Sequence, residues 1–160
     1  MSFTPQFSPT AQLHDSIIAQ LKALPSVTTA IPADRIGVWY DNKQQLTGTN
    51  VRVFCDDDGE ERGAVGPSVY TFTLSVAILT NHDLTTSEIQ DPLETPHDVH
   101  ESIVGAIWYA FKDSLMTIPT IDGLQSAGNI VFTGKGSGSD DRGWFVDVLT
   151  FTYPYSIPLT

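Results

Sequence analysis

The feature that most constrains this chain is a long amphipathic segment at residues 95–116, TPHDVHESIVGAIWYAFKDSLM. Its apolar side chains recur at steps of three and four, which is the period of one face of an α-helix. Thr95 is placed to cap the first turn, and Pro96 suits the first helical position. We therefore expect a central helix whose apolar face packs on a sheet. The expected stripe consists of Val99, Ile103, Val104, Ile107, Trp108, Phe111 and Leu115.

A second helix is expected near the N-terminus. Ser8 is placed to cap it, Pro9 suits its first position, and Pro25 ends it. The residues before it, 1–7, are interpreted as an extended arm with two phenylalanines. The apolar stripe of this helix consists of Leu13, Ile17, Leu21 and Leu24.

Two long strands are marked by alternation of side chains with a period of two. In VYTFTLSVAIL, residues 69–79, aromatic and aliphatic residues alternate with Thr and Ser. Residues 144–157 show the same period, with Leu149, Phe151, Tyr153 and Tyr155 on one side. Because proline lacks a backbone N–H, Pro154 predicts that the last residues lie at an edge or leave the sheet. Shorter strands are expected at 36–40, 50–55 and 129–133.

The order of these elements is helix, short strands, long strand, helix and hairpin. It predicts a single α+β domain over residues 1–160, with a mixed, mostly antiparallel sheet and two α-helices packed on one face. Two segments rich in glycine or charge, 56–68 and 134–143, are expected to be flexible loops. The connection at 80–94 is expected to be a long loop.

The composition limits the classes of function. Lys and Arg total 8 against 19 Asp and Glu, so the formal net charge is −11 at pH 7. A surface this acidic is not expected to wrap nucleic acid, because phosphate contacts need cations. The single cysteine, Cys55, cannot form an intramolecular disulfide, which fits a reducing compartment. We expect neither a signal peptide nor a membrane helix, since no basic start or apolar run of about 20 residues is present.

Three clusters invite a metal-binding or catalytic interpretation, and each lacks part of its motif. The acidic run at 56–61 lacks the alternating ligand spacing of a calcium loop. His97 and His100 have the spacing of a zinc pair, but no third and fourth ligand is evident, so we interpret them as surface residues. GKGSG at 134–138 is neither a phosphate loop nor a nucleophile elbow. We therefore expect no enzyme activity and no cofactor; the alternative is a small α+β metal- or ligand-binding enzyme using Asp83, His97 and His100.

Apolar residues lie on both sides of the last strand and around the central helix. They are interpreted either as surface that another chain covers or as an ordinary core with a few aromatic residues at its rim. The arm at 1–7 is interpreted either as a segment docked on a neighbouring subunit or as a frayed tail. The glycine-rich tip at 134–143 is interpreted either as a segment that becomes ordered on a partner or as a segment that is simply disordered. The candidate contact residues are Phe3, Phe7, Asp56, Asp57, Asp58, Lys135, Asp140, Asp141 and Arg142.

Five segments follow one another in a characteristic order: a helix ending near Pro25, VTTAIPADRI, VYTFTLSVAIL, PHDVHESIVGAIWYAF, and a hairpin ending DVLTFTYPYSI. In order and character, this pattern resembles the tail terminator and tail-completion proteins of long-tailed bacteriophages. The resemblance covers most of the chain. The connection at 80–94 is longer than the family pattern needs.

The resemblance implies a structural subunit of a homohexameric ring in the virion, assembled in the host cytoplasm. Such a ring caps the tail tube and joins it to the neck, so its partners are the tail tube protein and a neck connector or stopper. Viral DNA passes through the lumen without specific binding, and an acidic lumen would repel its phosphates. The alternative within the same class is another neck component, a head–tail connector or stopper.

Overall fold

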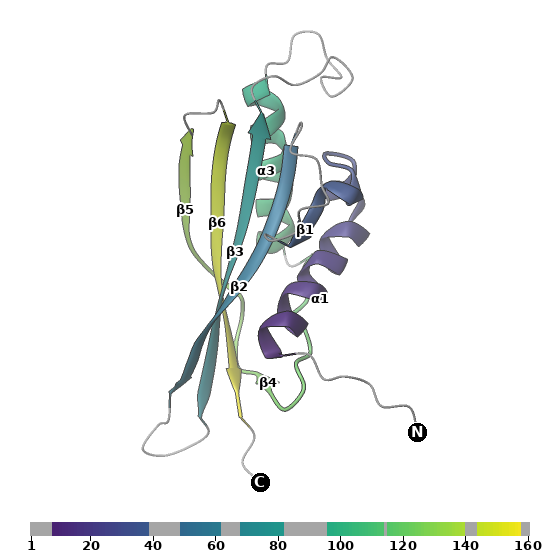
Figure 1. Ribbon diagram of the computed structural model, residues 1–160. Coiled ribbons are helices and arrows are strands. Elements are labelled where there is room, and N and C mark those ends of the chain that lie inside the picture. The colour runs from purple at the N-terminus through teal and green to yellow at the C-terminus, as the bar shows by residue number, and fades with distance from the viewer. Residues whose placement is uncertain are drawn as a thin grey trace.

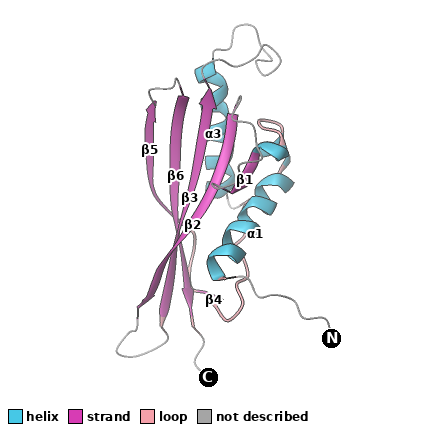
Figure 2. Cartoon of the chain, in the orientation of Figure 1, coloured by secondary structure: helices cyan, strands magenta, loops and turns pink. Residues whose placement is uncertain are grey.

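The computed structural model describes residues 8–38, 49–61, 68–81, 96–113, 115–139 and 144–157. A six-stranded, mostly antiparallel sheet carries the helices on one face (Figures 1 and 2), so the expected α+β class is confirmed. The strand order is β1–β2–β3–β6, and both β5 and β4 pair with the far side of β6. The elements are α1 (Pro9–Ala23), α2 (Pro25–Thr28), a 3-10 turn (Ala33–Arg35), β1 (Ile36–Val38), β2 (Thr49–Glu61), β3 (Val69–Asn81), α3 (Pro96–Lys112), β4 (Gln125–Ser126), β5 (Val131–Ser139) and β6 (Trp144–Ser156).

The first helix forms as its sequence predicts. The Ser8 hydroxyl accepts a hydrogen bond from the Ala11 N–H at 3.3 Å, and Pro9 occupies the first turn, where a missing N–H is harmless. Leu13, Ile17 and Leu21 are completely buried. The helix ends before a proline, and the short helix α2 follows directly.

The central helix α3 also agrees with its predicted stripe over most of its length. Ile103, Val104, Ile107 and Phe111 are buried, whereas Val99 and Trp108 are only partly so. The prediction for Leu115 is wrong, because the helix ends at Lys112 and the Leu115 side chain is 49% exposed. The expected cap, Thr95, lies outside the described residues.

Both expected loops begin as strand. β2 continues to Glu61 along β3, with a register shift between Asp57 and Glu60, so the loop predicted at 56–68 is wrong for its first part. β5 extends to Ser139 opposite residues 145–152 of β6, so the loop predicted at 134–143 is wrong for residues 134–139. Ladder bonds join backbones, so charged or glycine side chains do not prevent pairing, although glycine weakens it. Residues 62–67 and 140–143 lie outside the described residues.

The expectation that Pro154 ends the sheet is wrong. β6 runs to Ser156, and Pro154 lies opposite Thr71 of β3. The carbonyl of Pro154 accepts a hydrogen bond from the Ala127 N–H at 3.0 Å, on the side of β4. In an antiparallel strand the N–H and C=O of one residue point to the same side. The missing N–H therefore faces the short strand β4 and leaves the ladder with β3 intact.

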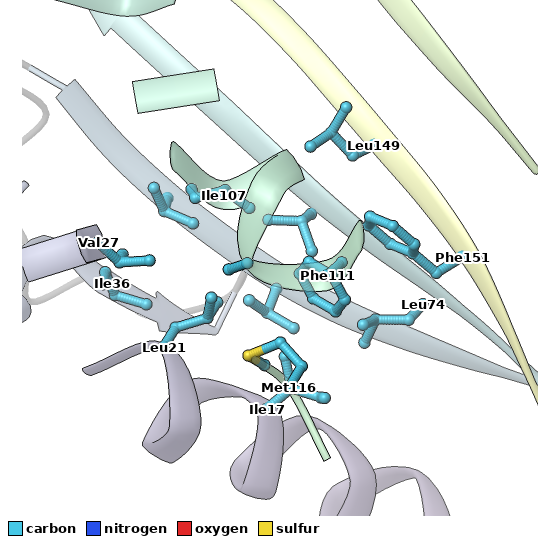
Figure 3. Close-up of a cluster of buried hydrophobic side chains, with 14 of the residues drawn as sticks. Ile17, Leu21, Val27, Ile36, Leu74, Ile107, Phe111, Met116, Leu149 and Phe151 are labelled. Carbon is cyan, nitrogen blue, oxygen red and sulfur yellow. The ribbon is translucent and has the colours of Figure 1, made fainter. Parts of the chain in front are cut away.

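The hydrophobic core lies between the helices and one face of the sheet (Figure 3). Leu74, Leu149 and Phe151 from the strands meet Ile107 and Phe111 from α3. The rings of Phe111 and Phe151 are stacked with centroids 4.1 Å apart. Each such side chain, when fully buried, contributes about 1.5–3 kcal/mol. Burial of apolar side chains thus holds the helices on this face of the sheet.

Two buried tyrosines on β6 give a matched stability test. The Tyr155 hydroxyl donates to the Pro119 carbonyl at 2.8 Å, while the buried Tyr153 hydroxyl has no partner in the described part of the chain. We expect Tyr155→Phe to lower the free energy of unfolding by about 1 kcal/mol, because it removes one hydrogen bond. Tyr153→Phe is expected to leave the free energy of unfolding unchanged or raise it. Urea denaturation of both variants measures the difference, and equal losses would contradict this assignment.

Candidate functional site

A chain of buried polar side chains links the first half of α3 to the sheet. The hydroxyls of Thr49 and Thr80 lie 2.9 Å apart, and Thr80 Oγ1 lies 2.6 Å from His100 Nδ1. His100 Nε2 in turn lies 2.5 Å from Asp147 Oδ2. Thr80 is fully buried, and the exposed fractions of His100 and Asp147 are 1% and 4%. The network therefore connects β2, β3, α3 and β6 inside the protein.

The carboxylate of Asp147 is also held from β5. Ser137 donates its hydroxyl to Asp147 Oδ1, and Lys135 Nζ lies 3.6 Å from the same oxygen. Burial alone would raise the pKa of the Asp147 carboxyl. The hydrogen bonds from Ser137 and His100, with the positive charge of Lys135, outweigh burial and hold that pKa below its ordinary value.

One direction of donation satisfies the whole chain of groups. With His100 assigned as the Nε2–H tautomer, the Thr49 hydroxyl donates to Thr80, the Thr80 hydroxyl donates to His100 Nδ1, and the His100 Nε2–H donates to Asp147. This order of hydroxyl, imidazole and carboxylate is that of a hydrolase triad. Here the hydroxyl of Thr80 is fully buried, so no substrate can reach it. The arrangement is suited to fixing α3 on the sheet rather than to attacking a carbonyl group.

The surface interpretation of the histidine pair is wrong for His100 and right for His97, whose side chain is 57% exposed. Possible ligand atoms of His100, Glu101 and Asp147 lie within 4.8 Å of one another. Ligands of a tetrahedral zinc are about 3.3 Å apart, given metal–ligand distances near 2.0 Å. At 2.5 Å, His100 Nε2 and Asp147 Oδ2 are too close to share an ion without moving apart. Asp83 lies outside the described residues.

Signals for this network were present in the sequence. His100 falls on the same helical face as Ile103, Val104 and Ile107, so its burial follows from the apolar stripe. Asp147 has the same strand parity as Leu149, so it points to the buried face of β6. What the sequence lacks is the register that brings the two together.

A second feature is an open apolar groove of about 600 Å³ between the C-terminal half of α3 and the start of β5. Trp108 and Phe111 of α3 line one side, and Phe132 of β5 lines the other. Lys112 is the one charged residue among the described residues that line the groove, and its Nζ lies 4.4 Å from the Trp108 ring centroid. The groove has no carboxylate in this lining, and it can accept an apolar or aromatic group.

The predicted partner-contact residues that the structure describes lie on two separate strands, β2 and β5. Asp56 is exposed on β2, with Asp57 and Asp58 next along the strand. Lys135 lies on β5, where its side chain is 39% exposed and reaches Asp147. Their role as contacts stays a prediction. The others, Phe3, Phe7, Asp140, Asp141 and Arg142, lie outside the described residues.

Comparison with known proteins gives a likeness in fold. No family model matches the sequence, and no curated protein matches it. Among solved structures, the chain is similar to a chain in the virion of a native gene transfer agent particle. The TM-score is 0.62 at 14% sequence identity, over 94% of this chain and 99% of that chain. At this identity the likeness shows a shared fold, over nearly the full length of both chains.

No helix in the described part of the chain is long and apolar enough to cross a membrane.

The first test of the polar network is Asp147→Asn. The amide keeps the shape but removes the charged acceptor of three groups, so we expect the free energy of unfolding to fall by about 2–3 kcal/mol. Asp113→Asn, at an exposed position just after α3, is the matched control and should change it by less than about 0.5 kcal/mol. Urea denaturation at neutral pH measures both. Equal effects would show that the network does not stabilise the fold.

The same variant tests how the free energy of unfolding depends on pH. The pKa of Asp147 is lower in the folded protein than its ordinary value of 3.8. The carboxylate therefore makes its full contribution to the free energy of unfolding above pH 3.8. The contribution is lost as the pH falls through the folded-state pKa. We therefore expect the stability difference between the wild type and Asp147→Asn to shrink as the pH falls below about 4. Denaturation curves from pH 7 to pH 2.5 check this, and a constant difference would contradict it.

Proposed function

We propose that this protein is a structural component of a phage-like virion, acting as a tail terminator. In this role, copies of the chain form a ring, expected to be a hexamer, that caps the tail tube and joins it to the neck. The observation that carries the proposal is the shared fold with a chain of a gene transfer agent virion, which extends over 94% of this chain. The order of sequence segments, which resembles tail terminators, is independent of that comparison.

The described surface also supports an assembly role over a catalytic one. The hydroxyl–imidazole–carboxylate arrangement of Thr80, His100 and Asp147 is buried, and its hydroxyl is out of reach of a substrate. Large apolar side chains remain exposed instead, including Tyr109 at 55% and Val131 at 52%. Contiguous apolar surface marks sites where another chain binds, and the groove lined by Trp108, Phe111 and Phe132 is such a surface. We therefore propose a non-enzymatic protein whose partners are its own copies, the tail tube protein and a neck protein.

The net charge of −11 fits the proposed passage of viral DNA. An acidic lumen repels phosphate groups, so DNA can slide through the ring without binding to it. The same fold and charge fit a second neck component, a head–tail connector or stopper, which is the alternative. Both alternatives place the protein in the virion, at the junction of head and tail, after assembly in the host cytoplasm.

The proposal predicts a ring of six copies. Size-exclusion chromatography with light scattering should give a mass about six times 17.5 kDa, and negative-stain electron microscopy should show rings with a central hole. If the ring forms only on its partner, it should appear after addition of purified tail tubes. A chain that stays monomeric in both conditions would contradict the proposal.

Purified tail tubes and tail-less heads separate the terminator from the connector or stopper. A terminator should pellet with tubes and block their further growth. Binding to heads alone would assign the chain to the connector or stopper instead.

A further inference from the structure

The exposed edge of β5 is an open template for another strand. Among the described residues, β5 pairs only with β6, so its outer edge carries no partner (Figure 1). Proteins usually protect such edges with charged residues, proline, short strands or bulges. β5 is nine residues long and has one cation, Lys135, and one irregularity near its start, while Phe132 is 44% exposed. An edge of this kind is suited to strand addition.

The apolar groove lies directly beside that edge. Phe132 contributes to the wall of the groove and packs on Phe151, with ring centroids 5.5 Å apart. Phe132 and Phe151 are register partners, so both side chains point to the face of the sheet that carries α3. A strand added to β5 would therefore place every second side chain along the groove.

Residues 1–7, MSFTPQF, have the composition of such a strand. Met1, Phe3, Pro5 and Phe7 alternate strictly with Ser2, Thr4 and Gln6. This period predicts an extended segment with one apolar and one polar face. Proline is tolerated in a strand at a sheet edge. None of the seven side chains is charged, so the segment can approach a protein of net charge −11 without repulsion.

We propose that residues 1–7 of a second copy of this chain add to the edge of β5 and place Phe3 and Phe7 over the groove. This contact would link neighbouring subunits, and it rests on the proposed ring. It joins two different surfaces of the chain, the arm of one copy and the β5 edge of the next. Head-to-tail contacts of this type generate a closed ring when the rotation between neighbouring subunits closes on itself.

Geometry favours a neighbouring copy over the same copy. The arm precedes α1, and α1 packs on β1 and β2, at the opposite side of the sheet from β5 (Figure 2). From β2 to β5 there are three strand spacings, or about 14 Å at 4.8 Å each. Seven extended residues span at most about 25 Å. An arm that crossed its own sheet would keep only about three residues to pair with β5.

Cysteine cross-linking tests this contact between copies. In a Cys55→Ser background, one sample carries Phe3→Cys or Phe7→Cys, and the other carries Phe132→Cys. The two are mixed under the conditions that give the ring and then oxidised mildly. We expect a disulfide-linked dimer in the mixture on a non-reducing gel, at least tenfold stronger than in either sample alone. Gln6→Cys with Phe132→Cys is the matched control, because residue 6 lies on the other face of the same arm.

A cross-link as strong from residue 6 would overturn the proposed register. A third sample carries Phe3→Cys and Phe132→Cys in the same chain, and a disulfide within that chain without a linked dimer would show that the arm docks on its own copy. Rings that form without any cross-link would contradict the proposed arm contact but not the proposed ring. A protein that stays monomeric even with tail tubes would contradict both proposals. A second measurement is the Phe3→Ser, Phe7→Ser double variant, which should lose the ring while still unfolding cooperatively in urea as a folded monomer.

Discussion

The antiparallel pairing of β3 with β6 is the constraint on which the rest of the structure depends. Its register places Phe72 opposite Tyr153, Leu74 opposite Phe151 and Val76 opposite Leu149, all on the face under the helices. A slip of one residue would turn every one of these side chains to the other face of its strand. The apolar surface of α3 would then have no matching surface, so burial of the core and the register of the sheet specify each other.

The same register brings buried polar groups together at one end of the core. Asp147 and Thr80 come from neighbouring strands, and His100 of α3 bridges them. Burying a carboxylate is costly unless it is hydrogen-bonded or paired, and here both conditions are met by groups on two elements, α3 and β5. An apolar contact allows a helix to slide by small amounts, whereas directional bonds do not. The network thus gives α3 a defined position along the strands.

That position also determines what is left uncovered. α3 ends at Lys112, so the sheet face beside the start of β5 remains open and the groove forms there. Phe111 is covered within the chain, whereas Phe132, at the edge, is not. The fold therefore leaves its exposed aromatic surface next to an open strand edge. The two features belong to one surface, and this is why we propose that a single extended segment covers both.

The amino-acid sequence by itself determined the local elements of this protein. The stripe of α3, the cap of α1 and the alternation of β3 and β6 follow from spacing, because helices and strands have fixed periods. The sequence also carried the burial of His100 and Asp147 separately, through their places in those periods. The sequence pattern did not determine the lengths of the strands. The segments Asp56 to Glu61 and Gly134 to Ser139 are polar or rich in glycine, yet they extend β2 along β3 and β5 along β6.

Only the tertiary structure decided which residues meet. The contact of His100 with Asp147 joins positions 47 residues apart, and the pairing of β5 with β6 determines where Lys135 and Ser137 reach the same carboxylate. The tolerance of Pro154 likewise depends on which neighbour its missing N–H faces. Such contacts depend on register and on backbone partners, which a side-chain pattern does not encode, whereas local periods are encoded directly in the order of the residues.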